Sequence, residues 1–117
     1  MATLFVGETG RLLRVNAGFD LSSYTELSLI FCKPNGTTAT KTTSDGVAIG
    51  GTAVTDADLG ALTANYYVTY SIESGLISTT DAGQWQVQLL YTNTGASPTD
   101  SLYGSIAYFT VNERCDT

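Results

Sequence analysis

Short stretches in which apolar and polar residues alternate recur along this chain, and residues typical of turns close each stretch. Residues 11–17 are the clearest example, because Leu13 and Val15 fall on one face while Arg14 and Asn16 fall on the other. A period of two residues is typical of a strand with one buried face, and no segment sustains the 3.6-residue period of a helix. Strands are therefore expected over residues 3–6, 11–17, 26–33, 37–42, 47–54, 66–72, 84–91 and 104–111.

Turn residues indicate how these strands connect. In Pro34-Asn35-Gly36-Thr37, the Asn-Gly pair tolerates the positive φ of a tight hairpin, so residues 37–42 should fold back on residues 26–33. Residues 55–58 are expected to cap a single helical turn that ends at Gly60. About seven or eight short strands joined by turns predict an all-β fold, an antiparallel β-sandwich in which residues 1–117 form a single domain.

The segment from Asp81 to Val87 carries a more specific pattern. It resembles the corner that leads into strand F of immunoglobulin domains, where an aromatic residue stands two positions before a buried cysteine. Here Trp85 takes the aromatic position and Val87 the cysteine position, which implies an immunoglobulin-like sandwich without that disulfide. The predicted core consists of Leu13, Val15, Leu27, Leu29, Phe31, Val68, Trp85, Val87, Leu89, Phe109 and Val111.

Composition and charge limit the partners that we expect for this domain. The chain has 117 residues, of which 43% are hydrophobic and 14% charged, so it has enough apolar content for its own core. Five basic residues stand against 11 acidic ones, for a formal net charge of −6, and the basic residues are scattered. Nucleic acids and anionic membranes attract clustered basic side chains. We therefore expect neither of them as a partner, and expect proteins instead.

The start of the chain and its two cysteines bear on where the protein is made. Residues 1–7 lack the basic and long apolar regions of a secretory signal, and no apolar run approaches the roughly 20 residues of a membrane-spanning helix. Synthesis in the cytoplasm is therefore expected. Cys32 is expected to be a small buried hydrophobe, and Cys115 lies in a polar tail. Cytoplasmic thiols usually stay reduced, so free thiols are the expectation and a Cys32–Cys115 disulfide is the alternative.

The sequence lacks the side chains of common catalytic sites. It has no histidine, the commonest general base and zinc ligand, and no glycine-rich phosphate loop. Asp56 and Asp58 are the one candidate carboxylate pair, but they fall in a predicted turn, where Asp commonly caps its own backbone. The alternating ligands and closing Glu of a calcium loop are missing as well. No catalytic residue, metal site or cofactor is expected, and the function should be non-enzymatic.

One motif connects the chain to a known group of proteins. Lys33-Pro34-Asn35-Gly36-Thr37 resembles the Lys-Pro-Asp-Gly-Thr hairpin of small phage structural proteins, which are similar to the immunoglobulin-like N-terminal domain of phage baseplate upper proteins. Three further segments follow the same order as in that group: residues 18–22 (GFDLS), residues 82–85 (AGQW) and residues 105–111 (SIAYFTV). The resemblance implies a structural protein of the virion, assembled in the host cytoplasm, that serves as a docking module of the tail or baseplate.

Other roles stay open beside this one. Baseplate upper proteins continue into a helical linker and a region that carries the receptor-binding protein, and neither is expected in this chain. Within the particle, the alternatives are a capsid decoration (cement) protein and a neck protein. Outside phage biology they are a carbohydrate-binding module, suggested by the seven tyrosines, and an adhesion domain, which the lack of a signal peptide disfavours. In every virion role the expected partners are other virion proteins, with several copies of this chain in the particle.

Three segments are candidates for contact with those partners. The first strand is short and apolar and starts near the chain end, so a neighbour can reach it, and deleting residues 1–6 is expected to leave the domain folded. Tyr67, in the strand expected over residues 66–72, is expected to point outward, and residues 92–100 form a long, polar loop. An alternative surface is the face that bears Gln84, Gln86 and Gln88. The candidate interface residues are Thr3, Leu4, Phe5, Val6, Tyr67, Asn93 and Ala96.

Overall fold

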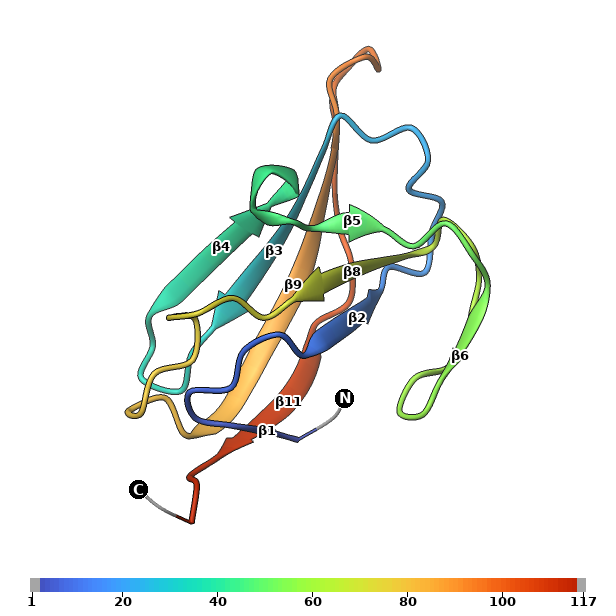
Figure 1. Cartoon of the computed structure of the whole chain (residues 1–117). Coiled ribbons are helices and arrows are strands. Elements are labelled where there is room, and N and C mark those ends of the chain that lie inside the picture. The colour runs from blue at the N-terminus through green and yellow to red at the C-terminus, as the bar shows by residue number, and fades with distance from the viewer. Residues whose placement is uncertain (1–2, 116–117) are drawn as a thin grey trace.

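Two β-sheets and a separate hairpin make up the fold, which a computed structural model describes for residues 3–115 (Figure 1). One 3-10 turn, η1 (Thr43–Asp45), joins two strands, and no helix of the described residues has the length and apolar character needed to cross a membrane. The strands are β1 (Leu4–Phe5), β2 (Leu12–Asn16), β3 (Glu26–Cys32), β4 (Thr38–Thr42), β5 (Ala48–Ile49), β6 (Val54–Asp56), β7 (Gly60–Leu62), β8 (Tyr67–Ser71), β9 (Gly83–Asn93), β10 (Asp100–Tyr103) and β11 (Ala107–Asn112).

The larger sheet has the strand order β1-β11-β9-β3-β4, and β10 also pairs with β9. All of its neighbours are antiparallel except β1, which runs parallel to the end of β11 with Leu4 opposite Val111. The second sheet has the order β2-β8-β5, and β6 and β7 form a hairpin of their own. The β9–β10 hairpin projects at one end of the molecule, and β1 lies at the other end (Figure 1).

The core between the two sheets contains every residue that the alternation predicts. All eleven of those side chains are at most 3% exposed, so the predicted core is confirmed. The Phe31 ring lies at its centre, with ring centroids 5.9 Å from Tyr70 of the opposite sheet, 6.3 Å from Trp85 and 6.4 Å from Phe109. Burial of such large aromatic side chains supplies much of the free energy that holds two sheets together.

The predicted Asn-Gly hairpin is also confirmed. Lys33 N–H donates to the Thr37 carbonyl at 2.9 Å, and Gly36 has a φ of +89°. The Asn35 side-chain oxygen accepts a hydrogen bond from Thr37 N–H at 3.0 Å. Positive φ is strained for most residues but open to glycine, so the turn depends on this sequence.

The strand expected over residues 47–54 is interrupted. β5 ends at Ile49 and pairs with β8, whereas β6 begins at Val54 and pairs with β7. Gly50 is buried between them, because the Tyr67 ring packs directly against its α-carbon: a β-carbon added there would lie 2.1 Å from that ring. The Tyr67 ring thus fills the space beside Gly50, where the expected strand is interrupted.

Two segments differ from their predictions. The helical turn expected after residue 55 is wrong, because this segment is the tight turn of the β6–β7 hairpin, where the Asp56 carboxylate accepts from Asp58 N–H at 2.8 Å and Leu59 N–H at 3.1 Å. The polar loop expected over residues 92–100 is shorter, since β9 continues to Asn93 and β10 begins at Asp100. The structure accordingly has eleven strands in place of about seven or eight.

Candidate interaction surface

The outward face of the larger sheet is the broadest regular surface of the domain. Its inward positions fill the core, so the alternate positions of β3, β4, β9 and β11 point away from it. The strand register aligns them in rows across the sheet. One row runs Tyr108, Gln86, Cys32, Thr38, and the next runs Gln88, Ile30, Thr40. We call these residues, together with Gln84, Leu90, Tyr103, Ile106 and Thr110, the outer face.

Large side chains are exposed along one side of the outer face. Tyr108 is 50% exposed, Tyr103 of β10 is 60% exposed, and Ile106, just before β11, is 47% exposed. Gln88 donates from Nε2 to the Gly104 carbonyl at 2.9 Å, which holds the bend between β10 and β11 against β9. Tyrosine is enriched in protein interfaces because it combines apolar area with a polar tip. The outer face therefore has the composition of a contact surface.

The outer face carries no charged side chain, because, of the two charged residues in β3, β4, β9 and β11, Glu26 lies at its margin and Lys41 lies on the other side of the sheet. Glu26, at the start of β3, accepts from Thr43 N–H at 3.1 Å and from the Thr43 hydroxyl, which hold the pKa of the Glu26 carboxyl below its ordinary value. Lys41 points to the opposite side of β4 and forms an ion pair with Glu73. A partner can thus cover this face without desolvating a charge.

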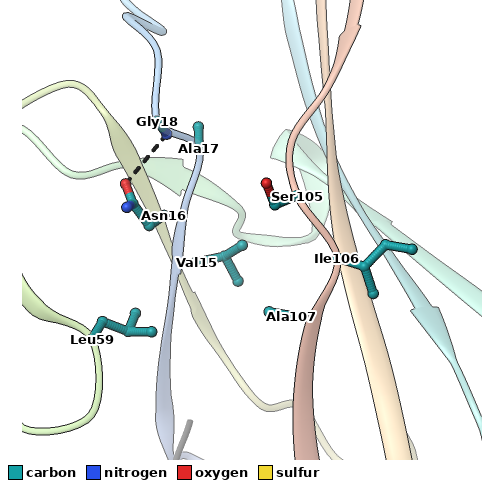
Figure 2. A pocket seen from close by; sticks show the side chains of 8 residues that line it. All are labelled: Val15, Asn16, Ala17, Gly18, Leu59, Ser105, Ile106 and Ala107. Carbon is teal, nitrogen blue, oxygen red and sulfur yellow. Dashed lines mark hydrogen bonds between the residues drawn. The ribbon is translucent and has the colours of Figure 1, made fainter.

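A groove of about 230 Å³ runs along the seam between β2 and the start of β11 (Figure 2). Val15, Ala17 and Ala107 contribute small or aliphatic side chains to its wall, and Leu59 reaches it from the β6–β7 turn. Its polar side chains are Asn16 and Ser105, and the Asn16 side-chain oxygen already accepts a hydrogen bond from Gly18 N–H. The lining holds no titratable side chain, so it offers no general acid or base.

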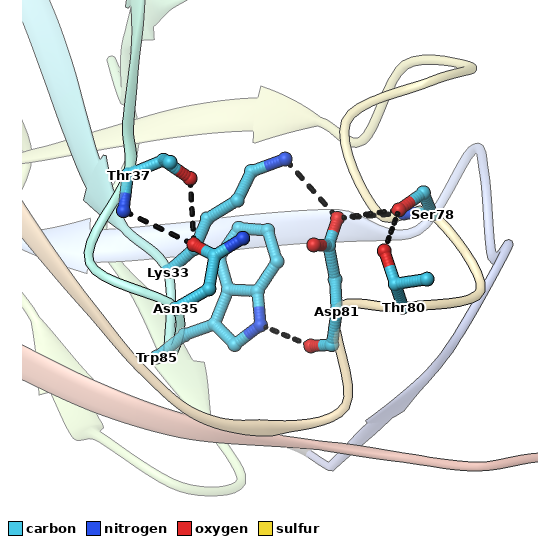
Figure 3. Close-up of polar contacts among 7 residues, drawn as sticks. All are labelled: Lys33, Asn35, Thr37, Ser78, Thr80, Asp81 and Trp85. Atoms are coloured by element: carbon cyan, nitrogen blue, oxygen red, sulfur yellow. Dashed lines mark hydrogen bonds and ion pairs between the residues drawn. The ribbon is translucent and has the colours of Figure 1, made fainter.

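A polar cluster at the other end of the sandwich brings together two motifs of the sequence (Figure 3). Lys33, from the Asn-Gly hairpin, places Nζ 3.1 Å from Asp81 Oδ2 and 5.4 Å from the centre of the Trp85 ring. Trp85 Nε1 donates to the Asp81 carbonyl at 2.8 Å, and Ser78 donates from both N–H and Oγ to Asp81 Oδ2. These contacts fasten the hairpin to the corner that precedes β9.

Electrostatics in this cluster favour the ionised Asp81. Its side chain is only 4% exposed, and this burial on its own raises the pKa of the carboxyl. Hydrogen bonds from Ser78 and the ion pair with Lys33 outweigh burial and hold the pKa below its ordinary value. Every polar group of the cluster thus has a structural partner. Nowhere in residues 3–115 do three His, Cys, Asp or Glu side chains gather into a group that could hold a metal ion.

The first strand does not behave as the free contact segment that its sequence suggests. Leu4 and Val6 are completely buried in the core, and Val6 N–H donates to the Asn112 carbonyl at 3.0 Å. The interface prediction for these two residues is therefore wrong, since the domain itself uses both their side chains and their backbone. Thr3 and Phe5 are exposed, Phe5 by 43%, on the opposite side of the strand.

The outward orientation expected for Tyr67 is also wrong. Tyr67 is 3% exposed, and its hydroxyl donates to the Thr52 carbonyl at 2.7 Å. Asn93 ends β9 and accepts from Gly95 N–H at 3.0 Å, and Ala96 lies partly buried at the tip of the hairpin. This tip and β1 lie at opposite ends of the molecule, so the predicted residues do not form one surface (Figure 1).

Sequence reasoning missed most of the outer face, although its glutamines form the alternative surface named above. Tyr103 lies outside the expected strands, whereas Ile106 and Tyr108 take outward positions of the strand expected over residues 104–111. Cys32 was expected to be buried, but it is partly exposed on the outer face, and both it and Cys115 are free thiols. The sequence feature that could have identified the outer face is the set of outward positions in β3, β4, β9 and β11. These alternate positions carry no charge except at Glu26.

Comparison with known proteins adds no family to this description. No protein-family model matches the chain, and no curated protein is similar to it.

Proposed function

We propose that this domain is a non-enzymatic structural protein of a bacteriophage particle, and that it docks onto other virion proteins through the outer face. The observation that carries the proposal is the uncharged row across that face in which Tyr108, Gln86 and Cys32 lie side by side. Desolvating a charge-free sheet surface with exposed tyrosines costs little free energy, so this surface suits a broad, flat protein contact.

The fold assignment within this proposal is an immunoglobulin-like sandwich. It is supported by the pairing of β1 with β11 beside β9, β3 and β4, opposite a separate β2-β8-β5 sheet. The hydrogen bond from Trp85 Nε1 to the Asp81 carbonyl is a second support. It reproduces, with an indole in place of a phenol, the bond that the conserved tyrosine makes to upstream backbone in immunoglobulin corners.

The place in the particle follows from the motifs that resemble phage proteins. Lys33-Pro34-Asn35-Gly36-Thr37 and the Ala82–Trp85 segment are close together in the structure, since Pro34 packs against Gly83. Their proximity supports the interpretation that they form one structural unit and are not two chance matches. A docking module of the tail or baseplate is the role that this resemblance favours, and decoration of the capsid or a place at the neck are the alternatives.

Replacing Tyr108 tests this proposal in assembled particles. Tyr108→Lys places a charge on the outer face, beside Gln86, and Leu12→Lys is the control, because Leu12 is 48% exposed on the opposite sheet. Particles made with each variant would be purified, and the copies of the protein per particle counted by quantitative mass spectrometry. We expect a normal count for Leu12→Lys and a loss of at least tenfold for Tyr108→Lys.

Two results would overturn the proposal. A folded Tyr108→Lys protein that enters particles at the normal count would exclude the outer face as the docking surface. Particles that lack the wild-type protein altogether would exclude the virion role. In that case, binding of the protein to a glycan array, lost when Tyr103 and Tyr108 are replaced, would favour the carbohydrate-binding alternative.

A further inference from the structure

We propose that the outer face is complementary to itself, and that the virion protein onto which it docks is a second copy of this chain, placed face to face about a two-fold axis. This inference rests on the proposed function, because it names the partner of the same docking surface. In such an isologous contact, each residue meets the same set of residues on the other copy.

Net charge restricts where two copies can meet. The chain has 11 acidic residues and a formal net charge of −6, so two copies repel each other at long range. A contact that brought acidic surfaces together would add like-charge repulsion at short range. The outer face avoids this, because Glu26 lies at its margin, Lys41 lies on the other side of the sheet, and both are bonded to neighbours within the chain.

The polar groups of the outer face match a copy of themselves. Gln84, Gln86, Tyr103 and Tyr108 make no side-chain hydrogen bond to any residue of the described part of the chain. Each of these groups can both donate and accept, so a rotated copy presents groups that can hydrogen-bond with them. Ile30 and Leu90 lie partly exposed between them and add apolar area. The same face thus supplies both halves of a complementary interface.

The flat area of the outer face is smaller than a standard protein interface, which suits a weak dimer. Strands spaced about 4.8 Å apart, with a rise of about 3.4 Å per residue, give the larger sheet a flat area of roughly 500 Å². Projecting tyrosine and glutamine side chains enlarge the accessible area beyond this. Specific interfaces bury about 800 Å² per partner. We therefore expect a reversible dimer that forms as the protein concentration rises.

The two cysteines provide a built-in test of this arrangement. Cys32 lies within the outer face, in the row of Gln86 and Tyr108, whereas the exposed Cys115 follows β11 outside it. A face-to-face dimer must cover Cys32 and leave Cys115 accessible. Alkylation by iodoacetamide, quantified at each cysteine by mass spectrometry, should therefore slow at Cys32 alone as the protein concentration increases.

Sedimentation equilibrium of the whole chain gives the second measurement. We expect the mass to rise from monomer to dimer with concentration for the wild type and for Leu12→Lys, and to stay at monomer for Tyr108→Lys and Gln86→Lys. Added salt should strengthen the dimer, since it screens the repulsion between two chains of charge −6 and there are no interfacial ion pairs to weaken.

The outcomes separate this inference from the proposed function. A protein that stays monomeric at every concentration, with Cys32 alkylated at a constant rate, overturns the second copy as partner. If Tyr108→Lys is nevertheless excluded from particles, docking through the outer face stands and its partner is another protein. A dimer that survives Tyr108→Lys and Gln86→Lys uses a different surface and also overturns the inference.

Discussion

Lys33 and Asp81 are 48 positions apart in the sequence, yet Lys33 Nζ lies 3.1 Å from Asp81 Oδ2, and both side chains are largely buried. The contact joins the hairpin between β3 and β4 to the corner before β9. Because the Lys33 ammonium also lies over the Trp85 ring, one cation is shared between a carboxylate and an aromatic face. The pair therefore couples a surface hairpin to the centre of the core.

Removing the carboxylate should destabilise the domain strongly. Asp81→Ala leaves the Lys33 ammonium without its partner and removes the acceptor for Ser78, and breaking a buried ion pair from one side costs about 3–5 kcal/mol. Urea denaturation would measure the loss in the free energy of unfolding. Asp20→Ala is the control, since Asp20 is exposed and bonds only the adjacent Ser22 turn. Equal losses in the free energy of unfolding for the two variants would show that the Lys33–Asp81 contacts do not stabilise the domain.

Two substitutions at Trp85 should separate its packing from its hydrogen bond. Trp85→Ala removes a fully buried side chain and should lower the free energy of unfolding by about 3–5 kcal/mol. Trp85→Phe retains much of the volume but leaves the buried Asp81 carbonyl without the Nε1 donor, which should cost about 1–3 kcal/mol. Thermal melts of both proteins provide the comparison. A Trp85→Ala protein that melts like the wild type would contradict the core assignment.

Stability should depend on the charge of Asp81 at acidic pH. Its folded-state pKa is lowered below 3.8, so its contribution to the free energy of unfolding is fully present above that value. The contribution is lost as the pH falls through the lower folded-state pKa. The difference in unfolding free energy between wild type and Asp81→Asn should thus be constant near neutral pH and shrink below about pH 4. A difference that stays constant down to strongly acidic pH would exclude the ionised Asp81.

The core could be predicted because it depends on local alternation. Residues such as Leu13 and Val15 occupy one face of a strand whatever that strand pairs with. The Gly50-Gly51 pair itself indicates a weak point in its expected strand, but the close approach of the Tyr67 ring to Gly50 from another strand could not be predicted. β10 was missed because Asp100–Tyr103 is short and becomes a strand only by pairing with the extended end of β9.

The outer face was only partly predictable for a related reason. Alternation shows that Gln84 and Gln86 point away from the core, but it does not show which side chains stand next to them. The adjacency of Tyr108, Gln86 and Cys32 follows from the register of three strands, which is a property of the whole sheet. Likewise, Leu4 was assigned to an interface because its strand is short, apolar and near the chain end, and its pairing with Val111 at the other end of the chain could not be predicted.

Two neighbouring glycines should respond differently to the same substitution. In Gly50→Ala the new β-carbon would lie 2.1 Å from the Tyr67 ring, so the ring or the backbone must shift, and we expect a loss of about 1–3 kcal/mol or more. Gly51→Ala meets nothing within 4 Å and should change the free energy of unfolding by less than about 0.5 kcal/mol. Chemical denaturation of both variants measures the contrast. Similar values at the two positions would show that Tyr67 does not pack against Gly50.

The first strand should prove to be part of the folded domain. Leu4 is completely buried opposite Val111, and truncation of a buried leucine costs about 2–5 kcal/mol, so Leu4→Ala should destabilise the protein by that amount. Phe5, the next residue, is 43% exposed on the other side of the strand, and Phe5→Ala should cost less than about 1 kcal/mol. Removal of residues 1–6 should therefore lower the melting temperature markedly, contrary to the expectation from sequence. If Leu4→Ala is as stable as Phe5→Ala, β1 is held too weakly to contribute to the core. The first strand would then again be a candidate contact for a neighbouring chain.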